Sequence, residues 1–335
     1  MVSSIVLYSA IPISVVVTLG LLRKWRARSW AKCVTNSCLR GKTFLITGAN
    51  SGIGFETAKA LVKRKARVIF ACRDIGKAKE AIAEIRKEQP NGGELIPMQL
   101  DLASFDSIEK FVEIVKAGFY KIDVLINNAG VAVPLKQDLK TKEGFEIHFG
   151  VNHLGHFYLT SLLLDHLKRA TPSRIVIVSS TLHEKGEINF EDLNLKKAIE
   201  ETKSGKSGRN NPGYNNSKLM NVYFMKALAD QLRGSGIDVS ACCPGFCYTN
   251  LFSVLYPYVP AYPYITGHPV NRLFIFTFQG SETVVFCASD YSIEGKTGKF
   301  YRDCVEYNSK HDFDKTIETK LWEVSEDLVR ARRPL

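Results

Sequence analysis

Short apolar runs alternate with longer amphipathic segments from Gly41 onward. The short runs are rich in β-branched residues, as buried parallel strands are, and they lie at 43–46, 68–71, 95–99, 124–126, 175–178 and 239–242. Between them, apolar residues recur at helical spacing over 52–65, 76–88, 105–117, 145–169 and 214–233. This alternation predicts an α/β fold with a doubly wound parallel sheet, in a single domain that covers about residues 40–328.

Two stretches interrupt the alternation. Residues 198–211 are polar and rich in Gly, Lys and Asn, which predicts a mobile surface loop. Residues 246–280 are crowded with Leu, Phe, Tyr and Pro. We expect this second stretch to be an apolar lid over a substrate site, or a contact with a bilayer. Core packing or a subunit contact is the alternative, and it leaves a homodimer open.

The N-terminal segment differs from the rest of the chain. Residues 5–22 contain no charged side chain, and five basic residues follow within ten positions: Arg23, Lys24, Arg26, Arg28 and Lys32. A run of about 18 apolar residues is just long enough to span a bilayer, and a basic flank favours the cytosolic side. A cleaved signal peptide would carry charge before the run and a small-residue cleavage site after it. We therefore predict that residues 1–28 form a transmembrane signal anchor with its basic flank.

The net charge and the cysteine content limit the classes of partner and metal that we expect. The chain has 335 residues and a formal net charge of +11, to which the basic flank contributes. The sequence contains no zinc-finger, helix-turn-helix or RNA-binding signature, so no nucleic-acid partner is expected. The eight cysteines lack the paired CxxC spacing of a zinc site. We therefore expect no metal, and reduced cysteines in a cytosol-facing compartment.

A glycine-rich turn joins the first strand to the first helix. Its sequence, TGANSGIG, follows a strand and opens a helix, which is the context that a dinucleotide-binding turn requires. Glycines allow the tight turn and the close approach of a pyrophosphate, and the helix N-terminus presents free N–H groups to it. The sheet is therefore predicted to be of the Rossmann type, with these cofactor-binding residues: Gly48, Asn50, Ser51, Gly52, Ile53 and Gly54.

The end of the second strand bears on the cofactor. An NAD-binding chain usually carries a carboxylate there for the ribose 2′-hydroxyl, whereas this chain has Cys72 followed by Arg73. A guanidinium can pair with a 2′-phosphate, so the sequence favours NADP(H). Asp101 and Leu102 close the third strand, and Asp101 has two roles open to it: a contact with the adenine, or the N-cap of the next helix.

Tyr214 and Lys218 open a strong helix, and their spacing puts both on one helical face. A nearby ammonium lowers the pKa of a phenol from its usual value of about 10, which would make Tyr214 a general acid or base. Alone, such a pair is equally typical of an amphipathic surface. Ser180, however, ends the fifth strand, where ligands collect in open α/β sheets, and Asn152 is a polar residue inside a predicted helix.

The motifs TGANSGIG, NNAG and YNNSK, with Asn152 and Ser180 in order between them, resemble the short-chain dehydrogenase/reductases. The resemblance implies that Tyr214 is the catalytic acid or base, that Lys218 binds the nicotinamide ribose and tunes Tyr214, that Ser180 polarises the substrate carbonyl, and that Asn152 holds a water in a proton relay. It also implies further cofactor contacts in the cleft and the nicotinamide loop, from Asn128, Ala129, Gly130, Pro244, Gly245 and Thr249.

Longer stretches, among them FEIHFGVNHLGHFYLT and LWEVSEDL, resemble the microsomal retinol dehydrogenases. That resemblance implies an NADPH-preferring enzyme that interconverts a lipophilic alcohol and its carbonyl compound, retinol and retinal first. It also implies the endoplasmic reticulum membrane with the domain facing the cytosol, with lipid droplets or mitochondria as alternatives. A sterol, steroid or fatty-aldehyde reductase is the second candidate, and a nucleotide-binding membrane scaffold with little turnover is the third.

Overall fold

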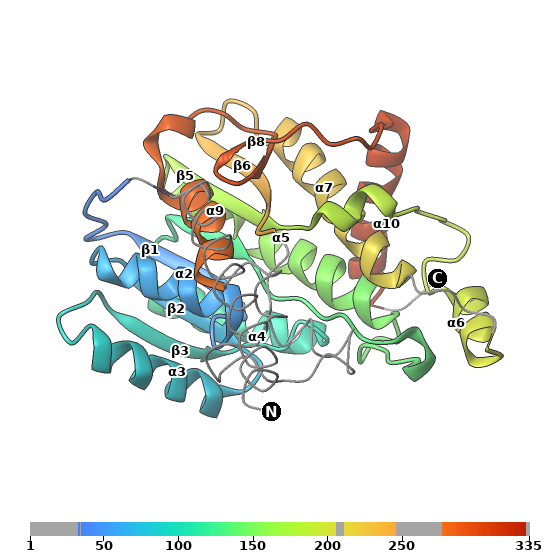
Figure 1. Cartoon of the computed structure of the whole chain (residues 1–335), viewed down its shortest axis with the longest axis horizontal. Helices are drawn as coiled ribbons and strands as arrows, with labels where there is room; N and C mark the ends of the chain where they lie inside the picture. The colour runs from blue at the N-terminus through green and yellow to red at the C-terminus, as the bar shows by residue number, and fades with distance from the viewer. Residues whose placement is uncertain (1–32, 34, 206–210, 246–276, 333–335) are drawn as a thin grey trace, which may run out of the picture.

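The computed structural model describes residues 33, 35–205, 211–245 and 277–332. One sheet runs through it in the order β3-β2-β1-β4-β5-β6-β7-β8 (Figure 1). Neighbours from β3 to β7 pair in parallel, and β8 pairs antiparallel with β7. The strands are β1 (Thr43–Thr47), β2 (Arg67–Cys72), β3 (Leu95–Gln99), β4 (Val124–Asn127), β5 (Ser173–Val178), β6 (Ile237–Cys243), β7 (Lys299–Arg302) and β8 (Val305–Glu306).

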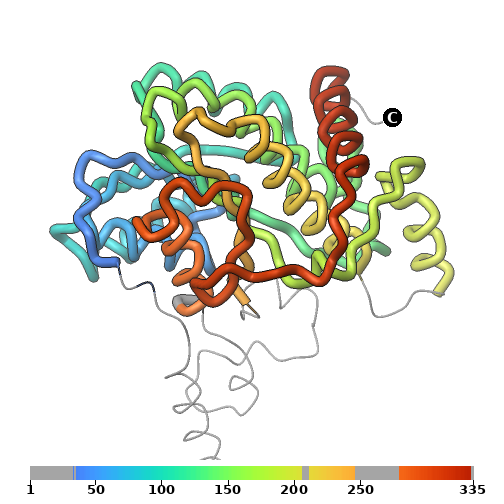
Figure 2. The backbone as a smooth tube through the Cα atoms, turned by 90° about the horizontal axis from the view of Figure 1, so that it is seen from above, coloured from blue at the N-terminus to red at the C-terminus, as the bar shows by residue number. Residues whose placement is uncertain are grey.

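Two layers of helices cover the sheet, one on each side (Figure 1 and Figure 2). One layer contains α2 (Gly52–Lys63), α3 (Ile75–Glu88) and α9 (Thr277–Ser289), and the other contains α4 (Phe105–Gly118), α5 (Gly155–Lys168), α7 (Pro212–Gln231) and α10 (Lys315–Ala331). Shorter pieces connect them: η1 (Leu135–Gln137), the π-helical η2 (Phe149–Leu154), η3 (Thr181–Lys185), α6 (Lys196–Lys203) and η5 (Tyr291–Ile293).

The central strands are apolar on both faces because helices cover both. Leu45 and Ile46 are adjacent in β1 and therefore point to opposite sides of the sheet, and each is fully buried, in a different core cluster. The strand order reverses between β1 and β4. In such sheets ligands bind in the crevice at the carboxyl ends of the strands, at that reversal. The doubly wound sheet predicted from the alternation is confirmed.

Side-chain caps set the starts of several helices. Asp74 accepts from the Lys77 amide at the start of α3, and Ser104 accepts from the Ser107 amide at the start of α4. Each cap satisfies an amide that would otherwise lack a partner in the first turn. Because Ser104 caps α4, the alternative that made Asp101 the N-cap of this helix is wrong.

The polar stretch at 198–211 was expected to be a loop, and this is wrong for its first part. Residues 196–203 form α6, whose Ile199 is buried. Lys203 Nζ pairs with Asp138 Oδ2 at 2.7 Å, just beyond η1. One apolar residue and one ion pair therefore dock α6 on the segment that follows β4, which the composition of the stretch did not indicate.

Other boundaries also differ from the prediction. The helix expected over 145–169 begins as the π-helical turn η2 and continues as α5. Residues 277–280, assigned to the lid, open α9 instead. The rest of the predicted lid, and Thr249 with it, lies outside the described residues. Strands β7 and β8 and the two last helices, α9 and α10, had not been predicted.

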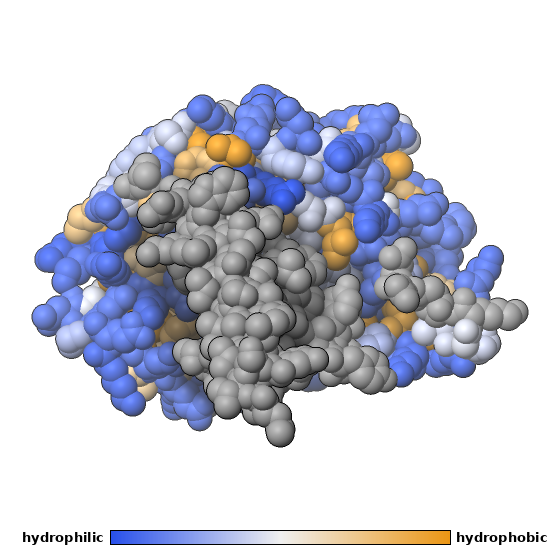
Figure 3. Space-filling model, in the orientation of Figure 1, coloured by the Kyte–Doolittle hydropathy of each residue, from blue (hydrophilic) through white to orange (hydrophobic). Residues whose placement is uncertain are grey.

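The predicted anchor, residues 1–28, also lies outside the described residues. Within the parts that the structure describes, no helix is both long enough and apolar enough to cross a bilayer. The segment that follows the anchor is held on the domain: the Cys33 amide donates to Glu282 Oε2 at 2.7 Å, and Arg64 donates to Ser37 and Ser289. On the face shown in Figure 3, the described surface is mostly hydrophilic, with hydrophobic residues only in small scattered groups.

Candidate active site

A cleft of about 640 Å³ opens at the carboxyl ends of β1, β2, β4 and β5. The structure brings most of the residues singled out in the sequence together around it: Gly48, Asn50, Ser51, Gly52, Ile53, Gly54, Arg73, Asp101, Leu102, Asn128, Ala129, Gly130, Tyr214, Lys218 and Pro244. These residues come from segments that are far apart in the chain. Their convergence shows that the motifs belong to one site.

The glycine-rich turn is packed too tightly for larger residues. A Cβ on Gly54 would lie 2.5 Å from both the Gly48 carbonyl oxygen and Asn128 Nδ2. The Ser51 side chain does not cap α2, so it does not compete for the first amides of the helix. A close backbone and open N–H groups at a helix N-terminus are what a pyrophosphate requires. The residues present therefore fit a dinucleotide.

Thr47 ties this turn to the end of β4. Its Oγ1 accepts from the amides of Asn128 and Ala129, both at 2.9 Å, and Asn128 Nδ2 donates back to the Thr47 carbonyl at 2.8 Å. Buried polar groups are costly unless paired, so these bonds hold the floor of the cleft rigid. Sequence reasoning assigned Asn128 to the cofactor and overlooked Thr47 as its support.

The two groups expected at the adenosine end both reach the cleft. Arg73 is exposed and lines it, while the neighbouring Asp74 is engaged as the cap of α3. Asp101 Oδ1 accepts from the Ala103 amide at 3.0 Å, and the residue lines the cleft. The contact of Asp101 with the adenine remains a prediction.

Tyr214 and Lys218 meet in the cleft, nearly buried, on the first turns of α7. The Lys218 ammonium lies 5.6 Å from the centre of the Tyr214 ring, and it donates to the Val178 carbonyl at 3.0 Å. Burial lowers the pKa of Lys218 from 10.5 to about 8. A nearby cation is what a phenol with an acid or base role requires, and that role of Tyr214 remains a prediction.

Asn152 lies in η2, fully buried, behind the cleft wall. Its Oδ1 accepts from the Val131 amide at 2.7 Å, and its Nδ2 donates to the Val131 carbonyl at 3.0 Å and to Ser217 Oγ at 3.0 Å. The Asn152 side chain therefore joins the segment after β4 to α7. A relay water, as implied by the family resemblance, remains a prediction.

His156 is a further supporting residue that the sequence analysis did not single out. Its Nδ1 lies 3.1 Å from the Asn152 carbonyl oxygen and its Nε2 lies 2.9 Å from Thr47 Oγ1. Burial lowers the pKa of His156 to about 4, so the ring is neutral near pH 7. In sequence its only signal is a second histidine one helical turn after Asn152.

The serine pair after β5 is arranged differently from what we expected. Ser179 lines the cleft, and its Oγ donates to the Lys218 carbonyl at 2.8 Å. Ser180 is half-buried, and its Oγ accepts from the Leu182 amide at the start of η3. Ser180 and Gly245 are not among the residues that line the described cleft. The catalytic role of Ser180 therefore remains a prediction.

An apolar wall completes the cleft, and most of it was missed in the sequence. It comes from Ala71, Leu100, Ala103, Val131, Ala132, Val133, Leu139, Ile147, Val151 and Val178. Most of these residues occur in segments where apolar side chains are expected for the core. Only the tertiary structure distinguishes the apolar residues that face the cleft from those that face the core.

The fold and the cleft define a class of protein. A doubly wound sheet with a dinucleotide-binding turn and a Tyr–Lys pair, at the point where the strand order reverses, is the arrangement of a nicotinamide-dependent oxidoreductase. The model of the short chain dehydrogenase family matches residues 42–191. Relatives include retinol dehydrogenase 14 of Mus musculus, 41% identical over 307 residues, which cover 87% of this chain and 86% of the relative. The chain belongs to the short-chain dehydrogenase/reductase family, whose members bind NAD(P)(H).

Other comparisons agree with this assignment. Retinol dehydrogenase 12 of Homo sapiens is 40% identical over 303 residues, with 90% of each chain covered. Among solved structures, an uncharacterised protein from Mycobacterium paratuberculosis superposes with a TM-score of 0.65 at 32% identity, covering 92% of this chain and all of the other. A 3-ketoacyl-(acyl-carrier-protein) reductase from Brucella melitensis, complexed with NADH, has a TM-score of 0.57 at 27% identity, covering 78% of this chain and 96% of the other.

Proposed function

We propose that this chain is an NADPH-preferring oxidoreductase that interconverts a lipophilic alcohol and its aldehyde or ketone, with retinol and retinal as the first candidates. The observation that carries the proposal is the meeting of Tyr214 and Lys218 in the same cleft as the glycine-rich turn. When bound, NADP(H) supplies or accepts the hydride. The protein orients the reactants and moves the proton.

Each residue has one task in this scheme. In reduction, the Tyr214 hydroxyl donates a proton to the developing alkoxide of the substrate, and in oxidation the phenolate removes it. The Lys218 ammonium stabilises that phenolate, and its own position is set by the Val178 carbonyl. The Ser180 hydroxyl is proposed to hold the substrate oxygen. The apolar wall excludes water and accepts an apolar substrate.

The proton-transfer role predicts the behaviour of Tyr214→Phe. The variant keeps the ring and loses the acidic hydroxyl, so turnover should fall at least about 100-fold while NADPH binding is retained. Steady-state rates and NADPH fluorescence titration measure the two effects separately. Undiminished turnover in Tyr214→Phe would refute the assignment.

The cofactor preference is assigned to Arg73, which is exposed at the cleft, while the neighbouring Asp74 carboxylate caps α3. Arg73→Glu should replace attraction for the 2′-phosphate by repulsion. We expect the ratio of kcat/KM for NADPH over NADH to fall at least about tenfold, since a lost charge-assisted bond is worth about 1.4 kcal/mol or more. Lys79→Glu, an equal charge change on an exposed residue of α3 outside the cleft, is the control. An unchanged ratio in Arg73→Glu would show that another group selects the cofactor.

The substrate class rests on the apolar wall and on relatives named retinol dehydrogenases. Sterol, steroid and fatty-aldehyde substrates share the same apolar character, so a panel of retinoids, sterols and lipid aldehydes with each cofactor should separate them. A protein that binds NADPH and turns over none of the panel would favour the scaffold role instead.

The proposed location is a membrane, with residues 1–28 as the anchor and the domain in the cytosol. The endoplasmic reticulum is the first candidate membrane. A homodimer is left open. Asn215 in Asn215-Asn216-Ser217 is buried in α7, only 5% exposed. A glycan there is incompatible with this packing, which favours the cytosolic side. Carbonate extraction with protease protection tests the proposal, and release of the protein or protection of the domain would contradict it.

A further inference from the structure

A buried carboxylate and a buried imidazole lie beside the active site, and the proposed mechanism does not use them. Glu146 and His148 precede η2, with side chains 3% and 0% exposed. Glu146 Oε1 lies 2.5 Å from His148 Nδ1. Charged groups are rarely buried without a specific requirement, so the position of this pair calls for a physical explanation.

The hydrogen bonds determine where the proton of the imidazole lies. The Val133 amide donates to His148 Nε2 at 3.0 Å, so Nε2 is an acceptor and carries no proton. The ring proton is therefore on Nδ1 and is donated to Glu146 Oε1. The other carboxylate oxygen, Oε2, accepts from the amides of His148 and Phe149 at 3.0 and 2.9 Å. Three N–H groups thus point at one carboxylate, which explains how it can remain buried.

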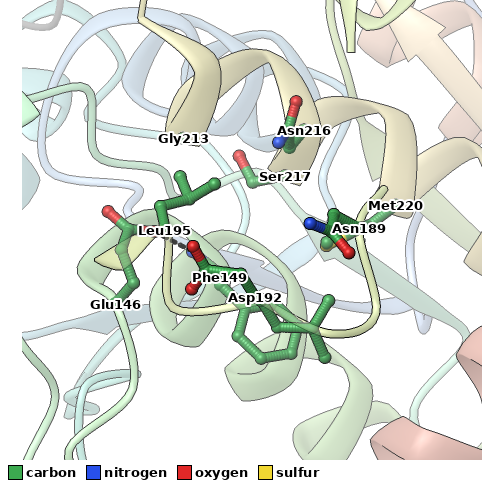
Figure 4. Close-up of a pocket in the computed structure, with 10 residues that line it drawn as sticks. Glu146, Phe149, Asn189, Asp192, Leu195, Gly213, Asn216, Ser217 and Met220 are labelled. Atoms are coloured by element: carbon green, nitrogen blue, oxygen red, sulfur yellow. Dashed lines mark hydrogen bonds between the residues drawn. The ribbon is translucent and has the colours of Figure 1, made fainter. Parts of the chain in front are cut away.

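The same pair touches the residue before the proposed proton donor. A Cβ on Gly213 would lie 2.7 Å from His148 Nδ1 and 3.2 Å from Glu146 Oε1. The backbone just before Tyr214 therefore rests directly on the pair. Figure 4 shows Glu146 close to Gly213, at the start of α7. A residue larger than glycine at position 213 would force either the pair or the start of α7 to shift.

Asn211 connects the segment around Val133 to the start of α7 by two further hydrogen bonds. Its Nδ2 donates to the Val133 carbonyl at 2.8 Å, and its Oδ1 accepts from the Tyr214 amide at 3.2 Å as the N-cap of α7. Val133 is thus held at its amide by His148 and at its carbonyl by Asn211. Val133 also lines the cleft, as do its neighbours Val131 and Ala132. One hydrogen-bonded circuit therefore connects the apolar wall with Tyr214.

We propose that Glu146 and His148 are positioning residues, which hold the 131–133 wall and the start of α7 at the spacing that lets Tyr214 meet the substrate oxygen. The inference rests on the proposed function, because it assigns the pair to the placement of the same proton donor. The pair touches neither the substrate nor the cofactor in this scheme. Its loss should therefore lower turnover while leaving the affinity for NADPH intact.

The main test compares two variants of His148. His148→Phe fills the space of the ring but offers no acceptor to the Val133 amide, whereas His148→Gln places an amide oxygen near the position of Nε2. We expect kcat to fall at least about tenfold in His148→Phe, because small misplacements of reacting groups reduce rates strongly, and to recover largely in His148→Gln. The dissociation constant for NADPH should stay within about twofold in both variants, an effect small on the scale of binding energies.

Two further variants guard against a general folding defect. His166→Phe replaces another buried histidine, at the far end of α5 and outside the circuit, and should leave kcat unchanged. Asn211→Asp keeps the cap of α7 but removes the donor to the Val133 carbonyl, without touching the core. It should lower kcat with NADPH binding retained, and it remains informative if His148→Phe does not fold.

The outcomes separate this inference from the proposed function. Unchanged kcat in both His148→Phe and Asn211→Asp, or loss of NADPH affinity in parallel with kcat, would overturn the positioning role. If the wild-type protein turned over no carbonyl compound, the proposed function would fail. Amide hydrogen exchange over 131–139 would then decide the positioning role alone: faster exchange in His148→Phe and not in His166→Phe supports it, and equal exchange in all three proteins rejects it.

Discussion

Replacing Lys218 by methionine should abolish turnover and yet stabilise the cofactor-free protein at pH 7. Lys218 is 3% exposed, and burial lowers its pKa from 10.5 to about 8. The difference between these values, at about 1.36 kcal/mol per pH unit, means that keeping this ammonium in the folded protein costs about 3 kcal/mol. Methionine has a similar length and removes that cost. The bond to the Val178 carbonyl is lost as well, which offsets about 1.5 kcal/mol.

The pH dependence gives the sharper test. Between pH 8 and 10.5 the unfolded chain still binds a proton at Lys218 that the folded protein has released, so the stability of the wild type rises with pH across this window. Lys218→Met lacks this rise. We therefore expect the variant to be more stable by about 1.5 kcal/mol at pH 7, and to lose this advantage as the pH approaches 10.5.

Denaturant unfolding of both proteins without cofactor, at several values from pH 7 to 10.5, measures the difference. Titrating groups that do not interact with Lys218 are common to the two proteins and cancel. Lys226→Met, on the same helix, controls for the change in side-chain type. A stability difference that stays constant across this range, or that grows in favour of the variant as the pH rises, would refute the burial argument for Lys218.

Two further predictions concern packing and acid stability. Gly54→Ala should destabilise the fold by about 1–3 kcal/mol, the usual effect of overpacking, and should weaken NADPH binding, because its Cβ would lie 2.5 Å from the Gly48 carbonyl oxygen. The control is Gly118→Ala, because nothing lies within 4 Å of a Cβ at that position. Equal thermal midpoints and equal NADPH affinities for the two variants would contradict the prediction. Burial lowers the pKa of His156 to about 4, so the unfolded state takes up a proton below about pH 6.5 that the folded state does not. Stability should therefore fall from pH 6.5 toward pH 4, by up to about 3 kcal/mol for this residue, and less steeply in His156→Gln; identical slopes in urea unfolding would count against it.

The sequence by itself determined the elements whose signals are local. Runs of β-branched residues indicated six of the eight strands in the described parts of the chain, because strands covered on both faces must be apolar at successive positions. The glycine-rich turn was recognisable because a strand, a tight turn and a helix N-terminus follow one another directly. The same holds for Tyr214 and Lys218, whose spacing of four residues puts them on one face of a helix whatever surrounds them.

The tertiary structure decided what depends on distant neighbours. Asp101 and Ser104 are both good capping residues, and only the hydrogen bond from the Ser107 amide shows which of them caps α4. The helix α6 forms in a polar stretch because Ile199 is buried and Lys203 pairs with Asp138, 65 residues away.

The same division holds inside the site. Asn152 was identified by its residue type, but its partners, Val131 and Ser217, lie 21 and 65 residues away. Spacing along the chain predicts which side chains share a face of one helix or strand. It does not predict which carbonyl or amide from another segment completes a buried polar group, because that depends on how the elements pack together.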